Sequence, residues 1–237
     1  MSNYIISNET KKRLIKDIKE VIKGDISKDG IYYIHDESDM LLGYALIIGP
    51  LGTPYEYGNF LFKFKFPHDY PYSPPQVSYL TNDCKTRFHP NLYKNEKVCL
   101  SVLNTWRGEG WTSCLTIKSI LLILQSILDS KPLCHEPGIT ESHKDLQTYN
   151  KIIKYRTCQV AIYRVLNKEI YPKIIDLFWD KISENFTNNY DKILSSFPVD
   201  YSDELSTTIY SMNAKINYNN LKSQFNRFLE KNKKDII

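Results

Sequence analysis

The chain has 237 residues, a length that suits one large domain or a domain of about 150 residues with a subdomain. Apolar residues make up 42% of the sequence and charged residues 24%, which excludes a largely disordered chain, a collagen-like fibre and a small disulfide-stapled scaffold. Lys and Arg number 31 and Asp and Glu 27, and the formal net charge of +4 does not indicate nucleic-acid binding without a concentrated basic stripe.

No segment predicts export or membrane insertion. The densest apolar stretch, 117–128, is interrupted by polar residues and is shorter than the roughly 18 residues of a membrane span. The N-terminal residues lack the apolar core of a signal peptide. The five cysteines form no CxxC pair, which favours free thiols in a reducing compartment. We therefore expect an intracellular protein, cytoplasmic or nuclear, without a membrane or nucleic-acid partner.

The first predicted element is a helix over residues 9–23. Its apolar residues recur at helical spacing, and Ser7 or Asn8 can provide the N-cap. Lysines such as Lys11 and Lys12 occupy much of the remaining surface. This basic face suits either simple solvation or the docking of an acidic partner.

Four extended segments follow, joined by short and turn-rich connections that indicate an antiparallel meander. In the third segment Phe62, Phe64 and Phe66 share one face. The four predicted strands are 30–35, 41–48, 58–66 and 76–80.

Two irregular segments lie around the fourth strand. Residues 67–75, PHDYPYSPP, contain four prolines and cannot form a helix or a central strand, so a stiff turn is expected. Residues 81–115 show no periodicity. A loop of that length inside a compact domain usually carries function.

The remaining pattern is helical. Residues 116–128 predict a buried helix that is apolar nearly all round, residues 142–168 predict another, and further helical patterns follow Pro172. This order predicts an α+β fold with an N-terminal helix, a four-stranded antiparallel meander, an active-site loop, a buried helix and C-terminal helices. We divide the chain into a core domain, 1–168, and a helical C-terminal extension, 169–237, packed on the core.

The long loop contains the one concentrated candidate site, 89–111. Cys99 is either a small buried hydrophobe or a nucleophile, and its place in an irregular segment near the amide of Asn91 favours the nucleophile. No cysteine-protease signature surrounds it. The spacings of cysteine and histidine match no compact zinc site, so no metal is expected.

Three motifs in this order resemble those of ubiquitin-conjugating enzymes. Residues 66–75 fit the family pattern FPxxYPxxPP, and residues 89–91 are its HPN motif. Cys99 follows Asn91 by eight positions, as the family's catalytic cysteine does, and WTSCLTI at 111–117 is similar to WSPALTI. The combination is highly specific, and the resemblance covers roughly residues 9–165.

Within the family, the chain is similar to the larger Z-type enzymes and to the conjugating domain of the giant inhibitor-of-apoptosis protein. Trp111 follows Cys99 by twelve positions, and Trp106 is inserted between them. The segment CHEPG at 134–138 also resembles that branch.

The resemblance implies a transferase with the UBC fold that acts as a thioester carrier. Cys99 would accept the C-terminus of ubiquitin, or of a ubiquitin-like modifier, from an activating enzyme. A substrate lysine would then attack the thioester, usually with a ligase holding both. No cofactor is expected on the chain, because ATP is used by the upstream activating enzyme.

The resemblance also assigns roles to neighbouring residues. Asn91 is the expected oxyanion donor or loop brace, and both roles can hold together. His89 and Pro90 are expected to build the turn. Glu136 is our candidate for positioning the attacking lysine, with His135 and Asp129 as rivals.

Ligase and activating-enzyme contacts are expected on helix 9–23, on PHDYPYSPP and on WTSCL. Ser113 and Cys114 stand where the family often has Pro-Ala. The candidate contact residues are Lys11, Lys12, Tyr72, Ser113 and Cys114.

Two other classes of function stay open at this stage. A non-catalytic ubiquitin-binding scaffold of the same fold would lack the cysteine, whereas Cys99 is present. A nucleic-acid-binding protein would carry stacking aromatics along a basic stripe, whereas Phe225 and Phe228 lie at core spacing.

Overall fold

A computed structural model describes residues 6–199 and 201–236. The helices are α1 Asn8–Lys23, α2 Ile117–Ser126, α3 Leu146–Arg156, α4 Pro172–Leu177, α5 Trp179–Ser195 and α6 Tyr218–Ile236. The strands are β1 Ile31–His35, β2 Leu42–Ile48, β3 Asn59–Lys65, β4 Gln76–Tyr79, β5 Ser202–Ser206 and β6 Asn213–Asn217. Shorter helical segments are η1 Ile26–Asp29, η2 Ser101–Leu103, η3 Pro132–His135, η4 Thr157–Arg164 and η5 Ile209–Ser211.

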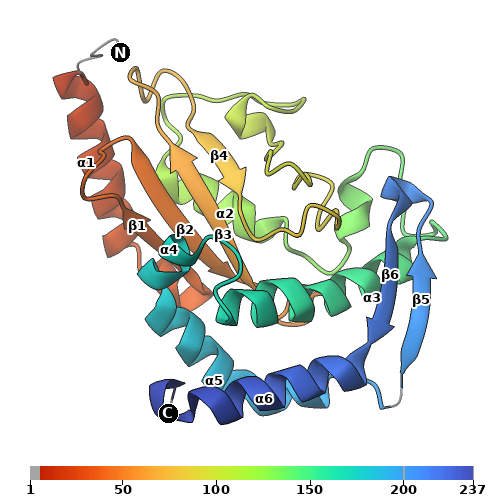
Figure 1. Cartoon of the computed structure of the whole chain (residues 1–237). Helices are drawn as coiled ribbons and strands as arrows, with labels where there is room; N and C mark the ends of the chain where they lie inside the picture. The colour runs from red at the N-terminus through yellow and green to blue at the C-terminus, as the bar shows by residue number, and fades with distance from the viewer. Residues whose placement is uncertain (1–5, 200, 237) are drawn as a thin grey trace.

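The first four strands form the predicted antiparallel meander in the order β1-β2-β3-β4 (Figure 1). The register pairs Ala45 with Phe62 and Phe62 with Tyr79. Phe62 and Phe64 are fully buried, because helices cover the face to which the alternation of β3 directs them. The predicted α+β class is confirmed.

Helices α1 and α2 each begin at a residue whose side chain caps the first turn. Ser7 caps α1 by accepting the main-chain N–H of Thr10 at 3.0 Å, as predicted. Thr116 and Ser119 form a capping box at the start of α2. The predicted burial of α2 is confirmed for its inner face, where Ile117, Ile120, Leu121 and Leu124 are buried. It is wrong for the outer face, where Leu122 is 39% exposed.

The predicted helix over 142–168 begins later, at Leu146, and changes its winding. Residues 157–164 form a π-helix, η4, that continues α3. Asn59 on β3 donates to the carbonyl oxygen of Ala161 inside this segment at 3.0 Å. The sheet therefore binds a carbonyl that the wider winding leaves accessible.

The extension contains the predicted helices, α4, α5 and α6, but it is not helical throughout. A β hairpin, β5–β6, interrupts it, and no pattern in the sequence predicted this hairpin. The hairpin strands are mostly polar, and only Leu205, Ala214 and Ile216 alternate toward the core. That pattern is too short to stand out from a loop.

Aromatic side chains join the extension to the core. The ring of Tyr155 on α3 lies 5.2 Å from that of Tyr218, and the ring of Tyr163 lies 5.7 Å from that of Phe225. Figure 1 shows α5 and α6 running below α3. The boundary between 1–168 and 169–237 stays a prediction, and residues 1–5, 200 and 237 lie outside the described residues. No helix within the described part of the chain is long and apolar enough to cross a membrane.

One carboxylate of the core holds the tip of the hairpin. Asp145 accepts hydrogen bonds from the N–H of Thr208 at 2.8 Å, its hydroxyl at 2.6 Å and the N–H of Ile209 at 2.9 Å. Burial of Asp145 opposes its ionisation, but these hydrogen bonds outweigh burial and hold its pKa below the ordinary value. Its contribution to stability is therefore present above the pKa of an unfolded aspartate and is lost as the pH falls through the lower folded pKa.

We predict that Asp145→Asn lowers the free energy of unfolding by on the order of 1 kcal/mol at pH 7, because a neutral acceptor binds the same donors more weakly. The difference in the free energy of unfolding between variant and wild type should narrow as the pH falls below about 4. Urea denaturation at pH 7 and at pH 3 measures this difference. Glu204→Gln is the control, since the Glu204–Lys215 ion pair on the same hairpin is exposed and should contribute little. Equal losses in the two variants at pH 7 would contradict the prediction.

Candidate functional site

Cys99 lies in the long loop between β4 and α2, and both main-chain and side-chain hydrogen bonds hold it there. The Cys99 N–H donates to the carbonyl of Asn91 at 2.9 Å. The hydroxyl of Thr105 accepts from the N–H of Leu100 at 2.9 Å and donates to the carbonyl of Val98 at 2.9 Å. The chain on both sides of Cys99 is thus fixed, and the residue is only 2% exposed.

Asn91 forms a hydrogen bond with Cys99, the residue whose reaction it is expected to assist. Its side-chain amide donates to the carbonyl of Cys99 at 2.5 Å. An amide group carries two donor hydrogens, so this bond leaves one free for another acceptor. The arrangement shows the bracing contact directly and is compatible with the oxyanion role.

The ring of His89 holds the main chain at Asn91 by a hydrogen bond. Its Nδ1 accepts the N–H of Asn91 at 3.0 Å, and this places the proton of a neutral ring on Nε2. The ring is fully buried, and burial, followed by the nearby His135 and Arg87, lowers its pKa well below the ordinary value. His89 therefore stays neutral at physiological pH and builds the turn, whereas Pro90 is buried beside it.

Arg87, which no sequence motif marked, anchors the same turn. Its guanidinium donates to the carbonyl of His89 at 3.1 Å and to that of Pro90 at 2.6 Å. It lies 3.2 Å from the centre of the Tyr93 ring and 4.9 Å from that of Tyr210, in the extension. Its position two residues before HPN was the only available signal, and no motif marked Tyr210.

The three candidates for positioning a lysine lie close to the turn, and each has a partner. Glu136 accepts a hydrogen bond from the hydroxyl of Tyr210. His135 and Asp129 are paired at 2.7 Å, and the ring of His135 lies 4.8 Å from that of His89. Any of the three would have to exchange or share a partner to hold a substrate amine.

The predicted contact residues lie on exposed parts of α1 and of the two loops beside it. Lys11, Lys12, Ser113 and Cys114 are exposed, and Tyr72 is 65% exposed. The hydroxyl of Tyr72 donates to Glu9 on α1 at 2.6 Å. The structure therefore brings these residues onto neighbouring elements, while their contacts with other proteins stay a prediction.

Arg13 and Trp111 tie these loops to the core. Arg13 on α1 donates to the carbonyls of Ser113 at 2.5 Å and Leu115 at 2.6 Å. The indole of Trp111 donates to the carbonyl of Pro71 at 2.7 Å, and its ring lies 5.9 Å from that of Tyr70. The loop 111–115 is thus pre-formed against α1 and the proline-rich turn.

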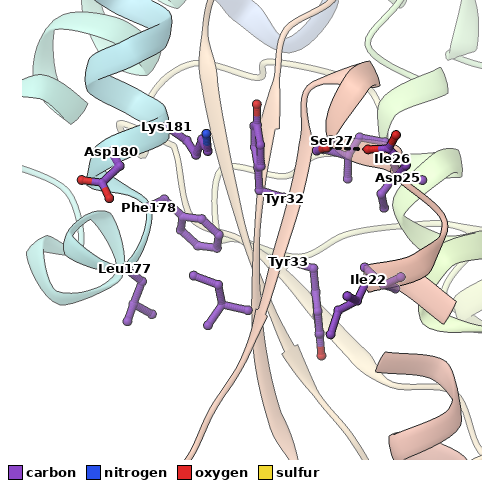
Figure 2. Close-up of a pocket in the computed structure, with 13 residues that line it drawn as sticks. Ile22, Asp25, Ile26, Ser27, Tyr32, Tyr33, Leu177, Phe178, Asp180 and Lys181 are labelled. Carbon is purple, nitrogen blue, oxygen red and sulfur yellow. Dashed lines mark hydrogen bonds between the residues drawn. The ribbon is translucent and has the colours of Figure 1, made fainter. Parts of the chain in front are cut away.

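One cavity lies away from this loop. It has a volume of about 380 Å³ and lies between the C-terminal end of α1, strand β1 and the start of α5. Figure 2 shows Phe178 and Leu177 on one side of it and Tyr33 and Ile22 on the other. None of its lining residues belongs to the segment around Cys99. Within residues 6–199 and 201–236, no group of His, Cys, Asp and Glu side chains has the arrangement of a metal site.

The sequence and the fold of this chain are similar to those of known proteins. Residues 12–158 match the family model for the ubiquitin-conjugating enzyme. The chain is 37% identical over 182 residues to ubiquitin-conjugating enzyme E2 Z of Danio rerio, covering 76% of this chain and 54% of the relative. It is 35% identical over 174 residues to the dual E2 ubiquitin-conjugating enzyme/E3 ubiquitin-protein ligase BIRC6 of Mus musculus, covering 64% of this chain and 4% of the relative.

A solved structure of a Plasmodium yoelii protein, described as a ubiquitin conjugating enzyme, aligns with a TM-score of 0.53 and 27% identity. The alignment covers 66% of this chain and 98% of that one. The chain spans about half the length of the E2 Z relatives that it matches. Because the family model matches more than half of the chain, and the motifs and fold agree with it, the chain belongs to the ubiquitin-conjugating enzyme family.

Proposed function

We propose that this protein is a ubiquitin-conjugating transferase that carries ubiquitin, or a ubiquitin-like modifier, as a thioester on Cys99. One observation supports this most strongly: Cys99 and Asn91 are joined by two hydrogen bonds in a loop held by the HPN turn. Its membership of the family, with relatives named E2 Z, supports the same reaction. The non-catalytic alternative has no observation in its favour, since the cysteine and its supporting residues are all present.

The reaction proceeds in two transfers. The sulfur of Cys99 attacks the thioester between the modifier and an activating enzyme, a new C–S bond forms, and the activating enzyme's thiol leaves. A substrate lysine nitrogen then attacks the carbonyl carbon, the C–S bond breaks, and the Cys99 thiolate leaves and takes up a proton. A thioester is reactive toward amines, so the chain needs no cofactor of its own, and the activating enzyme uses the ATP.

The second transfer passes through a tetrahedral oxyanion. The free hydrogen of the Asn91 amide would donate to this oxyanion while the other keeps its bond to the Cys99 carbonyl. The attacking lysine must also lose a proton, and a nearby carboxylate would orient it and stabilise its charge until it does. Glu136 is the proposed group, with Asp129 and His135 as alternatives.

The proposed partners follow from the same reaction. They are the modifier, an activating enzyme, a ligase and substrate proteins with accessible lysines. Lys11, Lys12, Tyr72, Ser113 and Cys114 are the proposed contacts for the activating enzyme and the ligase. Because Cys99 must stay a free thiol, we place this activity in a reducing compartment, the cytoplasm or the nucleus.

We predict that Cys99 forms the thioester. Incubation with ATP, ubiquitin and a panel of activating enzymes should give an adduct on a non-reducing gel that thiol reductants remove. Cys99→Ser should give a more slowly formed ester that resists reductant, because an oxygen ester does not exchange with thiols.

The control is Cys84→Ala, which removes an exposed cysteine outside the proposed contacts and should charge like the wild type. If Cys99→Ala still forms a reductant-sensitive adduct, the assignment of Cys99 is wrong.

We also predict that Asn91→Ala leaves charging largely intact and slows discharge to free lysine. Loss of one oxyanion donor in a preorganised site reduces the rate by about 10²–10³. Single-turnover discharge measures this rate, and the melting temperature reports the lost brace separately. Asn95→Ala, an exposed amide in the same loop, is the control. Discharge of Asn91→Ala at the wild-type rate would leave Asn91 with the bracing role alone.

A further inference from the structure

We propose that the C-terminal hairpin positions the active-site loop, and that Tyr210 is the positioning residue that does so through Arg87. The proposal rests on the proposed function only for its effect on the reaction rate. The contacts between the extension and the HPN turn do not depend on that function. Figure 1 shows the tip of the β5–β6 hairpin beside the loop that follows α2.

Arg87 is held from both parts of the chain. The core contributes the hydroxyl of Tyr149, which donates to the Arg87 carbonyl at 2.7 Å, and the ring of Tyr93 against the guanidinium. The extension contributes the ring of Tyr210 against the guanidinium and the sulfur of Met212, which lies 3.3 Å from the main-chain nitrogen of Arg87. The hairpin therefore contacts Arg87 at its side chain and at its main chain.

Tyr210 is itself held in an unusual backbone conformation. Its φ is +61° and its ψ is 4°, in the left-handed region that residues other than glycine seldom adopt. The Asp145 carboxylate binds the two preceding residues, and Glu136 accepts the hydroxyl of Tyr210. Burial, followed by this hydrogen bond, raises the pKa of Tyr210, so the hydroxyl stays a donor. Two carboxylates of the core thus orient the ring toward Arg87.

The effect reaches Asn91 through the main chain. Arg87 binds the carbonyls of His89 and Pro90, the two residues directly before Asn91. Loss of the Tyr210 ring would open one side of the guanidinium to water, and water would compete with these carbonyls for its hydrogens. Asn91 would then be less well oriented, so the step that uses Asn91 should slow while charging of Cys99 does not.

The experiment compares Tyr210→Leu, Tyr210→Phe and Tyr218→Leu in the full chain. Tyr210→Leu should discharge to free lysine about fivefold more slowly at an unchanged charging rate, the factor expected for one cation–π contact of about 1 kcal/mol. Tyr210→Phe keeps the aromatic ring and should slow discharge less than Tyr210→Leu does. Tyr218→Leu removes an aromatic contact that the extension makes with α3, away from Arg87, and should lower the melting temperature without slowing discharge.

A double variant separates positioning from a general loss of stability. In the Asn91→Ala background, Tyr210→Leu should cause no further loss of discharge rate, because its effect passes through Asn91, whereas losses of melting temperature should add. A full fivefold loss in that background, or a wild-type discharge rate for Tyr210→Leu alone, would overturn the proposal.

A second measurement does not depend on enzymatic activity. In NMR spectra of the uncharged protein, Tyr210→Leu should shift the side-chain amide signals of Asn91 and speed hydrogen exchange at the Cys99 N–H, and Tyr218→Leu should do neither. Unchanged Asn91 and Cys99 signals would overturn the proposal even in an active enzyme. If instead the signals shift but no activating enzyme charges Cys99, the proposed function fails and the structural coupling stands.

Discussion

The two hydrogen bonds from Arg87 to the carbonyls of His89 and Pro90 are the contact on which the active-site loop depends. The loop between β4 and α2 has few strand partners, so its main-chain polar groups must be satisfied in other ways. Arg87 satisfies the carbonyls before Asn91, and Asn91 and Thr105 do the same on either side of Cys99. Side chains thus add to the few main-chain pairs that hold the segment around Cys99.

Burial sets the chemical character of the residues in this network. His89 is enclosed and neutral, and its Nδ1 can accept the N–H of Asn91 only in that state. A protonated ring would lose this acceptor and place a buried positive charge beside Arg87 and His135. The HPN turn therefore uses histidine as a neutral hydrogen-bonding group that fixes the main chain at Asn91.

The extension is a second support for the same loop rather than a separate unit. Its helices pack on α3 and η4 through aromatic rings, and its hairpin tip is held by Asp145 and Glu136. Through Tyr210 and Met212 the extension then contacts Arg87. This arrangement gives the C-terminal region a direct physical route to the loop around Cys99.

The amino-acid sequence alone determined the α+β order, the four strands, the helix predicted over 116–128 and the candidate pair Asn91 and Cys99, because periodicity and motif spacing are local signals. It did not reveal the hairpin, whose strands are short and mostly polar. Nor did it reveal the partners of Arg87, since Met212 is 125 positions away in the sequence. Only the tertiary structure decided those contacts, because packing brings together residues that share no local pattern.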